Sequence, residues 1–89
     1  MGYRNIQFSN SFVKQFKKLP ASQQTQFYNR LLLFKADPSA RALRDHALKG
    51  KFVGYRSINI TGDVRALYYV QQDVVVIFAF IGTHSQLYG

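Results

Sequence analysis

Cysteine and glutamate are both absent from this chain of 89 residues. Without cysteine there is no disulfide framework, no thiolate metal site and no cysteine nucleophile. The side chains left for proton transfer are those of histidine, aspartate and tyrosine, and histidine suits that task best near neutral pH. Two histidines without cysteine or glutamate make too short a ligand set for zinc. We therefore expect no metal ion and no other cofactor.

Long apolar runs are also lacking. The longest, Val74 to Ile81, falls far short of the roughly 20 residues that span a bilayer. The opening stretch M-G-Y-R-N-I-Q-F-S has no apolar core of the kind found in secretory signal peptides. We therefore expect a cytoplasmic protein with no membrane partner. The length favours a single domain, residues 1–89, with a modest core.

Negative charge is scarce as well. Four aspartates face twelve lysines and arginines, which gives a net charge of +8. A surface normally mixes both signs, so this imbalance creates a positive field over much of a small domain. The field favours nucleic acid, an anionic membrane surface or an acidic protein as partner, although a basic protein with no such partner has the same composition. We favour nucleic acid, because a strongly basic domain is its usual electrostatic counterpart.

The apolar residues that are present, 47 % of the chain, follow regular spacings. Residues 3–8 alternate between polar and apolar side chains, which predicts a short strand. Ser9 or Asn10 is suited to cap a helix that ends before Pro20, and a second helix is predicted over 20–36. The apolar stripes of the two helices are Phe12, Phe16 and Leu19, then Phe27, Leu31 and Phe34. The tight link between them predicts an antiparallel helical hairpin.

A basic connection with room for one helical turn spans 38–51, and three β segments follow at about 52–60, 64–71 and 74–82. Turns at T-G-D and Q-Q-D join these segments, so their strands should pair antiparallel. The resulting order is β-α-α-β-β-β. It predicts an α+β fold in which the N-terminal strand and the helical hairpin pack on an antiparallel sheet.

Alternation along the strands assigns side chains to the two faces of the sheet. In 52–60, the core side has Ile58 and Ile60, and the other side has Tyr55, Ser57, Asn59 and Thr61. In 64–70, one set is Ala66, Tyr68 and Val70, and the other is Arg65, Leu67 and Tyr69. Alternation alone does not say which of these two sets is buried. If Arg65 faces solvent, one face packs on the helices and the other is polar, partly basic and open to a ligand.

Two histidines and a set of cations are candidates for chemistry. His46 lies in the basic connection, and His84 follows the last predicted strand. The cations that flank His46 and the strand after it are Arg44, Lys49, Lys51, Arg56 and Arg65. Cations around an acid–base group suit a reaction at phosphate, because they hold a polyanion and stabilise charge on its oxygens. A structural or exposed histidine and a solvated charged surface are the simpler explanations.

Asp63 and Tyr88 are weaker candidates. Asp63 occupies the turn T-G-D, where turn chemistry alone favours an aspartate. Tyr88 could stack on a base or donate a proton, and it could equally pack its ring on the sheet. The residues alone leave these alternatives open.

Four short motifs nevertheless occur in one order between residues 45 and 88: D-H-x-L-x-G, G-Y-R, G-D-x-R-x-x-Y and G-T-H-x-x-L-Y. With the β-α-α-β-β-β order, they make the chain resemble the RelE/ParE superfamily of toxins from type II toxin–antitoxin modules, in its YafQ-like branch. The resemblance covers most of the chain, and it implies a RelE-like fold. One motif alone is a weak signal, whereas several in the family's order are a strong one.

The resemblance implies a ribosome-dependent endoribonuclease, an mRNA interferase that needs no metal. Such an enzyme cuts mRNA in the A site of the 70S ribosome and arrests translation. The ribose 2′-OH attacks the adjacent phosphate and leaves a 2′,3′-cyclic phosphate and a 5′-OH. The resemblance places catalytic positions at His46, Asp63, His84, Tyr88 and Arg65.

Roles for these residues follow as expectations. The two histidines divide the acid and base steps in an order left open, and Asp63 orients a histidine or raises its basicity. Arg65 stabilises the phosphorane together with Arg56, and Tyr88 stacks on a nucleobase. The residues expected to bind RNA are Arg44, Lys49, Lys51, Arg56 and Asn59.

Asn59 is a departure from the family, because YafQ-like toxins can have a histidine there. Asparagine can form hydrogen bonds but cannot transfer a proton near neutral pH. The identity of the general base and the level of activity are therefore open.

A toxin of this kind implies a cognate acidic antitoxin in a toxin–antitoxin hetero-oligomer. Its helix or extended segment should cover the basic face and block the histidines. Two other functions are alternatives: inhibition of DNA gyrase without nuclease activity, as in ParE-like relatives, and RNA binding by a non-catalytic basic module. One fold hosts several functions, so the fold does not decide among them.

Overall fold

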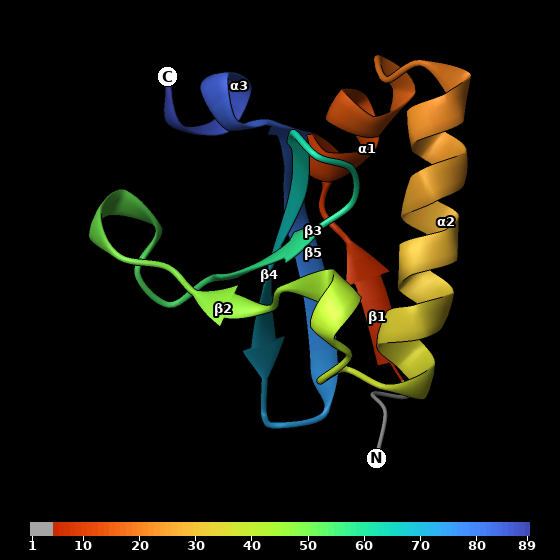
Figure 1. Ribbon diagram of the computed structural model, residues 1–89. Helices are drawn as coiled ribbons and strands as arrows, with labels where there is room; N and C mark the ends of the chain where they lie inside the picture. Colours follow the sequence, from red (N-terminus) through yellow and green to blue (C-terminus); the bar gives the residue numbers. More distant parts are fainter. Residues whose placement is uncertain (1–4) are drawn as a thin grey trace.

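The computed structural model describes residues 5–89, so the first two positions of the predicted strand 3–8 lie outside the described residues. Five strands form one sheet in the order β1-β5-β4-β3-β2 (Figure 1). The strands are β1 (Asn5–Phe8), β2 (His46–Ala47), β3 (Arg56–Asn59), β4 (Val64–Gln71) and β5 (Val75–Thr83). The helices are α1 (Asn10–Lys17), α2 (Ala21–Ala36) and α3 (His84–Tyr88), with single 3₁₀ turns η1 (Arg41–Leu43) and η2 (Gly50–Phe52).

The two long helices begin where their capping residues predict. The Ser9 hydroxyl accepts a hydrogen bond from the Phe12 backbone N–H at 3.0 Å and donates one to the Ala79 carbonyl at 2.7 Å. Pro20, which has no N–H to leave unpaired, precedes the first residue of α2. Ser9 therefore caps α1 and ties its start to β5, whereas α2 begins after Pro20 without a side-chain cap.

The predicted α+β class is confirmed, and β3, β4 and β5 pair antiparallel as expected. The sheet as a whole is mixed, because β1 runs parallel to β5 with Asn5 opposite Val75. The predicted strand 52–60 is shorter than expected and covers only Arg56–Asn59. Gly50 and Gly54 have φ values of +66° and +92°, a left-handed backbone that interrupts a strand. A two-residue edge strand, β2, precedes this loop and was not predicted.

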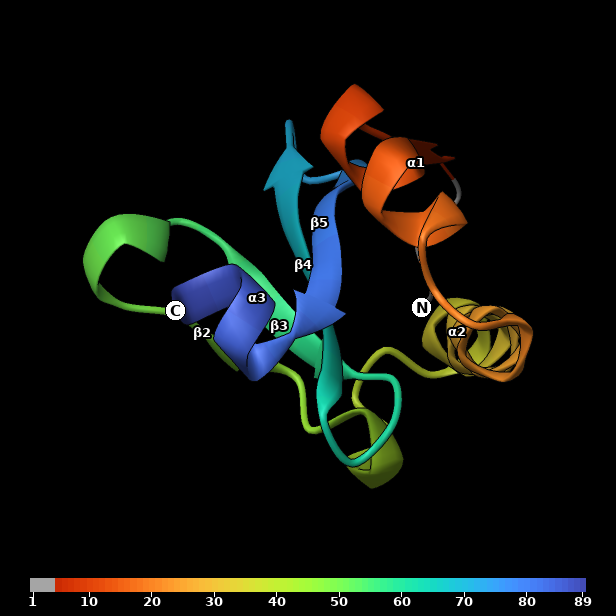
Figure 2. The same ribbon diagram turned by 90° about the horizontal axis from the view of Figure 1, so that it is seen from above.

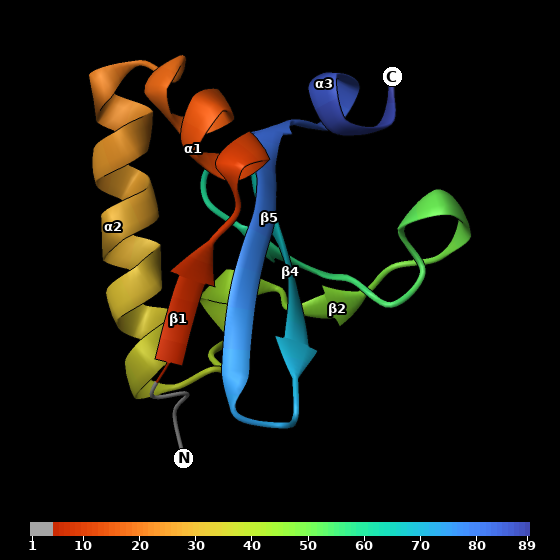
Figure 3. The ribbon, with the colours of Figure 1, turned by 180° about the vertical axis from the view of Figure 1, so that it is seen from behind.

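One face of the sheet is covered by α1 and α2, as Figure 1 and the view from behind in Figure 3 show. The core lies between these layers. Ile58 and Ile60 are almost fully buried there, which confirms their predicted orientation, and the burial of Tyr68 shows which set of residues in 64–70 faces the core. Phe78 on β5 is at the centre, with ring contacts to Phe8, Phe12, Phe27, Phe34 and Tyr68. Burying a phenylalanine side chain stabilises a fold by about 1.5–3 kcal/mol, so this cluster dominates the core.

The other face is more apolar than the sequence suggested. Leu67 is fully buried on it, and Ser57 is 1 % exposed. Five half-buried rings cover it: Phe52, Tyr55, Tyr69, Phe80 and Tyr88. The Phe52 ring contacts those of Tyr55, Phe80 and Tyr88, and the Tyr55 ring contacts that of Tyr69. We call these residues the aromatic patch. The expectation of a polar, partly basic face is therefore corrected. The face is largely aromatic, because Tyr69 and Phe80 point to it from the strands and Phe52 covers it from the loop between β2 and β3.

The C-terminal segment is helical, not a continuation of the strand. Thr83 accepts a hydrogen bond from the Gln86 N–H at 3.2 Å, and the Gln86 side chain accepts one from the Thr83 N–H at 2.8 Å. This reciprocal capping box starts α3, which lies beside the loop that contains η2 when the molecule is seen from above (Figure 2). Within residues 5–89, no helix is long and apolar enough to cross a membrane.

Candidate functional site

The short helix α3 brings the two last predicted site residues together. His84 and Tyr88 are four residues apart and so share one side of the helix. Their ring centroids lie 4.7 Å apart, and Tyr88 also contacts Phe52 of the aromatic patch at 5.4 Å. Burial raises the pKa of the Tyr88 hydroxyl, and the positive charge of Arg65 opposes that rise. Arg65 is therefore within electrostatic reach of this pair.

Arg65 is held at the same end of the sheet. On β4 it lies opposite Gly82 of β5 on one side and Asn59 of β3 on the other. Its Nη1 atom donates hydrogen bonds to the carbonyls of Thr61 and Gly62 at 3.2 and 3.1 Å. Directly opposed residues in an antiparallel ladder share a face. The fold thus gathers Arg65, Asn59, His84 and Tyr88.

Asp63 lies in the exposed turn just before β4. Its backbone N–H donates to the Thr61 hydroxyl at 3.3 Å, the hydrogen bond of turns in which a serine or threonine hydroxyl binds the backbone two residues further on. The next residue, Val64, pairs with Thr83, where α3 begins. Asp63 is therefore at the same end of the molecule as Arg65 and α3.

His46 is more distant from this group. It lies on the edge strand β2 opposite Ser57, which lies opposite Leu67, which in turn lies opposite Phe80 of β5. These successive cross-strand pairs place His46 on the face of the aromatic patch. Its strand, β2, is three strand spacings of about 4.8 Å from β5. Tyr88 of α3 contacts Phe52 in the loop that follows β2, so the helix that carries His84 lies over the same face as His46.

Arg56 does not join Arg65, contrary to the predicted pairing at a phosphorane. It lies opposite Tyr68 on the face that the helices cover. Its Nε atom donates to the Asp45 carboxylate at 2.7 Å, and the Tyr68 hydroxyl donates to the other oxygen of the same carboxylate. The hydrogen bond to Asp45 raises the pKa of the Arg56 guanidinium above its ordinary value. Alternation places residue 56 on the same side of its strand as Ile58, so its position on the core side could have been predicted from the sequence.

The other cations predicted to bind RNA lie in two places, one beside Asp45 and one beside the aromatic patch. Arg44 lines a hollow of about 520 Å³ together with Arg41, Asp45, Arg56 and Tyr68. Lys49 and Lys51 are exposed beside η2, and the Lys51 ammonium lies 5.2 Å from the centroid of the Phe52 ring. Lys51 therefore lies next to the aromatic patch, and Arg44 lies beside the Asp45 ion pair.

Asp45, like the patch residues other than Tyr88, was not among the predicted site residues. Its side chain is 12 % exposed, and both carboxylate oxygens have partners. Its position in the motif D-H-x-L-x-G, directly before His46, is the signal that could have identified it. In the part of the chain that the structure describes, no group of three histidine, cysteine or acidic side chains is arranged to hold a metal ion.

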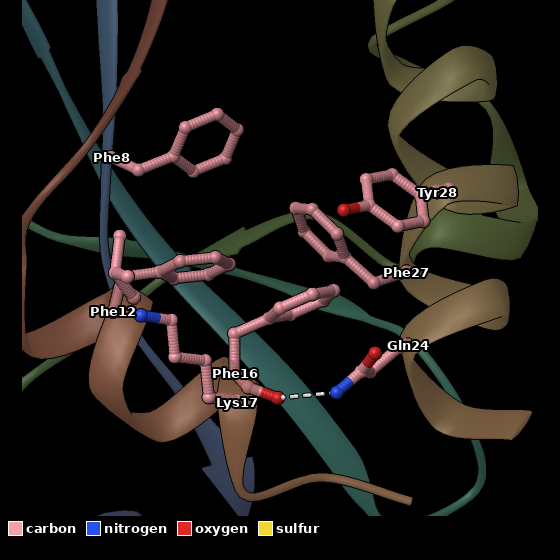
Figure 4. Close-up of a pocket in the computed structure, with 8 residues that line it drawn as sticks. Phe8, Phe12, Phe16, Lys17, Gln24, Phe27 and Tyr28 are labelled. Atoms are coloured by element: carbon pink, nitrogen blue, oxygen red, sulfur yellow. Dashed lines mark hydrogen bonds between the residues drawn. The ribbon is translucent and has the colours of Figure 1, made fainter. Parts of the chain in front are cut away.

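A second concave surface lies on the helix side, where the sequence placed no site. This groove of about 360 Å³ is lined mainly by the rings of Phe8, Phe12, Phe16, Phe27 and Tyr28 (Figure 4). The Gln24 side chain closes one end by donating to the Phe16 carbonyl at 3.0 Å. Its titratable lining residues are Lys17 and Tyr28, with no histidine or aspartate beside them, so we regard it as a packing or contact surface rather than a site of chemistry.

Comparison with known proteins identifies the family and supports the fold. Residues 4–89 match the sequence family described as the bacterial toxin of type II toxin–antitoxin system, YafQ. No curated protein matches the chain by sequence. The crystal structure of YafQ from E. coli strain BL21(DE3) is 26 % identical and has a TM-score of 0.74, with 97 % of this chain and 99 % of that chain covered.

Two further solved structures are similar over their full length. The toxin in the E. coli DinJ–YafQ complex is 27 % identical with a TM-score of 0.72, and 97 % of this chain and 99 % of that chain are covered. A copper-bound mutant toxin from Helicobacter pylori is 31 % identical with a TM-score of 0.70, and 99 % of this chain and 100 % of that chain are covered. The resemblance found in the sequence motifs is confirmed. The chain is a member of the YafQ family of type II toxin–antitoxin toxins.

Proposed function

We propose that this toxin is a ribosome-dependent endoribonuclease that cuts mRNA in the A site and acts in the cytoplasm. The observation that supports this most is the grouping of Arg65, His84 and Tyr88 beside the aromatic patch on the uncovered face of the sheet. An acid–base group, a cation and exposed rings are the parts that cleavage of a single RNA strand needs.

The reaction is attack of a ribose 2′-OH on the adjacent phosphate. One histidine removes the hydroxyl proton, and the other protonates the departing 5′-oxygen. Arg65 stabilises the negative charge that builds on the phosphate oxygens. Its hydrogen bonds to the turn come from Nη1, which leaves the rest of the guanidinium fork to meet a phosphate.

The remaining residues hold the substrate. Tyr88 and the rest of the aromatic patch stack on bases, and Lys49 and Lys51 contact the phosphate backbone of mRNA or ribosomal RNA. Asp63 lies close enough to the start of α3 to orient His84. Asn59, opposite Arg65, donates or accepts a hydrogen bond and transfers no proton. Because Arg56 is engaged by Asp45 on the covered face, we assign it no contact with the phosphorane.

We also propose a cognate acidic antitoxin as the partner in the cell. A relative of this chain is found in a DinJ–YafQ toxin–antitoxin complex, and a net charge of +8 favours an acidic binding protein. The antitoxin would neutralise the toxin by covering the face with the histidines.

Induced expression of wild type beside His84→Ala, with primer extension on a reporter mRNA, tests the proposal. Growth arrest with codon-phased cuts should occur in wild type, and both should be lost in the variant. Removal of one general acid or base slows a reaction by about 10²- to 10⁴-fold. His84 is exposed, so its loss should leave the thermal unfolding midpoint within about 2 °C.

Arrest without RNA cuts, unchanged in His84→Ala, would overturn the proposal. Double-strand DNA breaks in the presence of gyrase would then identify the ParE-like alternative. RNA binding without arrest or cleavage would identify a non-catalytic module.

A further inference from the structure

The strand that carries His46 is the most weakly paired part of the sheet. Strand β2 has two residues, both exposed, and it pairs only with β3. One further backbone hydrogen bond, from the Leu48 N–H to the Tyr55 carbonyl at 2.9 Å, extends this pairing. An edge ladder this short does little to fix the direction of a side chain. If His46 takes part in chemistry, something else must hold its ring.

Asp45, the residue before His46, links this edge to the core. Its carboxylate receives one hydrogen bond from Arg56 on β3 and one from the Tyr68 hydroxyl on β4. Tyr68 is 1 % exposed and contacts the rings of Phe34 and Phe78. The contact therefore runs from the centre of the core, across two strands, to the chain just before His46. A carboxylate with two such donors has little freedom to move.

Arg44, on the other side of Asp45, has an unusual backbone conformation. Its φ of 47° and ψ of 44° are left-handed, which is unfavourable for a residue with a Cβ atom. In this conformation its carbonyl oxygen lies 2.8 Å from Nδ1 of His46. A carbonyl only accepts hydrogen bonds, so the imidazole must donate from Nδ1. The neutral ring then has its proton on Nδ1 and its basic lone pair on Nε2.

We propose that Asp45 is a positioning residue for His46. By binding Arg56 and Tyr68, it holds the left-handed turn at Arg44, whose carbonyl selects the Nδ1–H tautomer of His46. His46 then presents Nε2 as a base for the 2′-OH, and His84 is left to protonate the 5′-oxygen. This assignment of acid and base rests on the proposed nuclease function. The tautomer itself does not, because it follows from the hydrogen bonds within the free protein.

The first test is the tautomer of His46, read from long-range ¹H–¹⁵N correlations of the imidazole rings at a pH where both histidines are neutral. The chain has only His46 and His84, and α3 carries the second one, so it serves as an internal reference. We expect His46 to have its proton on Nδ1 in wild type. A wild-type His46 with its proton on Nε2 overturns the proposal without any variant.

Two variants then test the role of Asp45. Asp45→Asn removes its charge at constant shape, and Tyr68→Phe removes one donor and keeps the buried ring. Both should shift His46 towards a mixture of tautomers and leave the His84 signals in place. The matched controls are Asp73→Asn, in the turn between β4 and β5, and Tyr28→Phe, at a ring that is 56 % exposed. If Asp45→Asn does not fold, Tyr68→Phe carries the test alone. An unchanged His46 tautomer in a folded variant overturns the proposal.

Arg44→Gly separates the carbonyl from the arginine side chain. Glycine adopts the left-handed conformation without strain and retains the carbonyl, so His46 should keep its proton on Nδ1. A tautomer change in Arg44→Gly would show that the side chain, and not the backbone, sets the ring, which would overturn the proposed mechanism of positioning.

Cleavage kinetics connect the tautomer to function. In a ribosome-dependent assay, Asp45→Asn should lower kcat by about 10-fold or more at unchanged KM, a part of the roughly 10²- to 10⁴-fold that a general base contributes. If kcat is unchanged while the tautomer shifts, His46 is not the base, and that assignment fails. If wild type shows no cleavage at all, the proposed function fails, and the tautomer result still stands.

Discussion

On the face of the sheet that α1 and α2 cover, Phe12, Phe27 and Phe78 are almost fully buried. On the opposite face, the rings of the aromatic patch are half-buried and have no such layer of helices over them (Figures 1 and 3). The two faces also differ in chemistry, because three of the five rings of the patch are tyrosines and Lys51 lies next to Phe52. Rings that pack on other rings stabilise a fold, whereas half-exposed rings beside cations are suited to bind bases and phosphates. The comparison therefore separates the stabilising face from the candidate binding face.

Phe78→Ala against Phe80→Ala is the strongest test of this comparison. Phe78 is fully buried among five other rings, and truncation should cost about 3–5 kcal/mol of unfolding free energy. Phe80 is half-buried on the other face, and its truncation should cost less than half as much while weakening RNA binding. Urea denaturation and RNA binding measure the two effects. Equal losses of stability in both variants would contradict the division into two faces.

Arg65→Ala should have the next largest effect, and it should act on catalysis. Removing a donor that stabilises transition-state charge costs about 10²- to 10³-fold in kcat. Arg30 is the matched control, because it is an arginine on α2 whose guanidinium also donates to a backbone carbonyl, that of Ile60 just after β3, at 3.5 Å. Single-turnover cleavage on ribosomes should show a large loss for Arg65→Ala and none for Arg30→Ala. Similar kcat values for the two variants would remove Arg65 from the chemistry.

Lys49→Ala combined with Lys51→Ala should weaken ribosome binding through electrostatics alone. Each lysine that contacts a phosphate adds about 1 to the slope of log K against log salt, so the double variant should reduce that slope by about 2. Lys14→Ala with Lys17→Ala, on α1, removes the same charge from the covered side. If the slope fell equally in both double variants, RNA binding would depend on the net charge of the protein and not on the face that carries the aromatic patch.

The titration of Tyr88 gives the smallest and most local test. Burial raises its pKa above the ordinary value of about 10, and the Arg65 charge lowers it. Ultraviolet difference titration of wild type against Tyr88→Phe should therefore show late ionisation, and Arg65→Ala should delay it further. Because the folded pKa is raised, this group destabilises the fold as pH increases above about 10. Ionisation of Tyr88 at or below pH 10 would contradict the partial burial of this end of the patch.

Much of this structure is predictable from the sequence because its signals are local. The Ser9 and Pro20 signals place two helix starts, and the turns T-G-D and Q-Q-D define the antiparallel strands. Alternation also assigns Ile58 and Ile60 to the core, whereas it left open whether Tyr68 or Arg65 faces inward. Each of these features depends on residues a few positions apart.

The features that were missed depend on distant or subtle partners. Nothing local indicates that β1 pairs parallel with β5, since the pairing joins residues about 70 positions apart. Asp45 looks like a loop aspartate until Tyr68 and Arg56 are seen to contact it. The helix α3 could have been found, because the T-x-x-Q spacing from Thr83 to Gln86 is that of a capping box. The apolar run before it favoured a strand and concealed this signal.

The parallel pairing of β1 with β5 has a consequence for synthesis of the toxin. Strand β5 lies between β1 and β4, yet it is the last strand to leave the ribosome. Until it emerges, Phe78 is missing from the core, Ser9 lacks its carbonyl partner, and α3 with His84 has not been made. Contacts between the two ends of a chain also slow folding. A nascent chain that lacks β5 and α3 therefore has neither a finished core nor the candidate site.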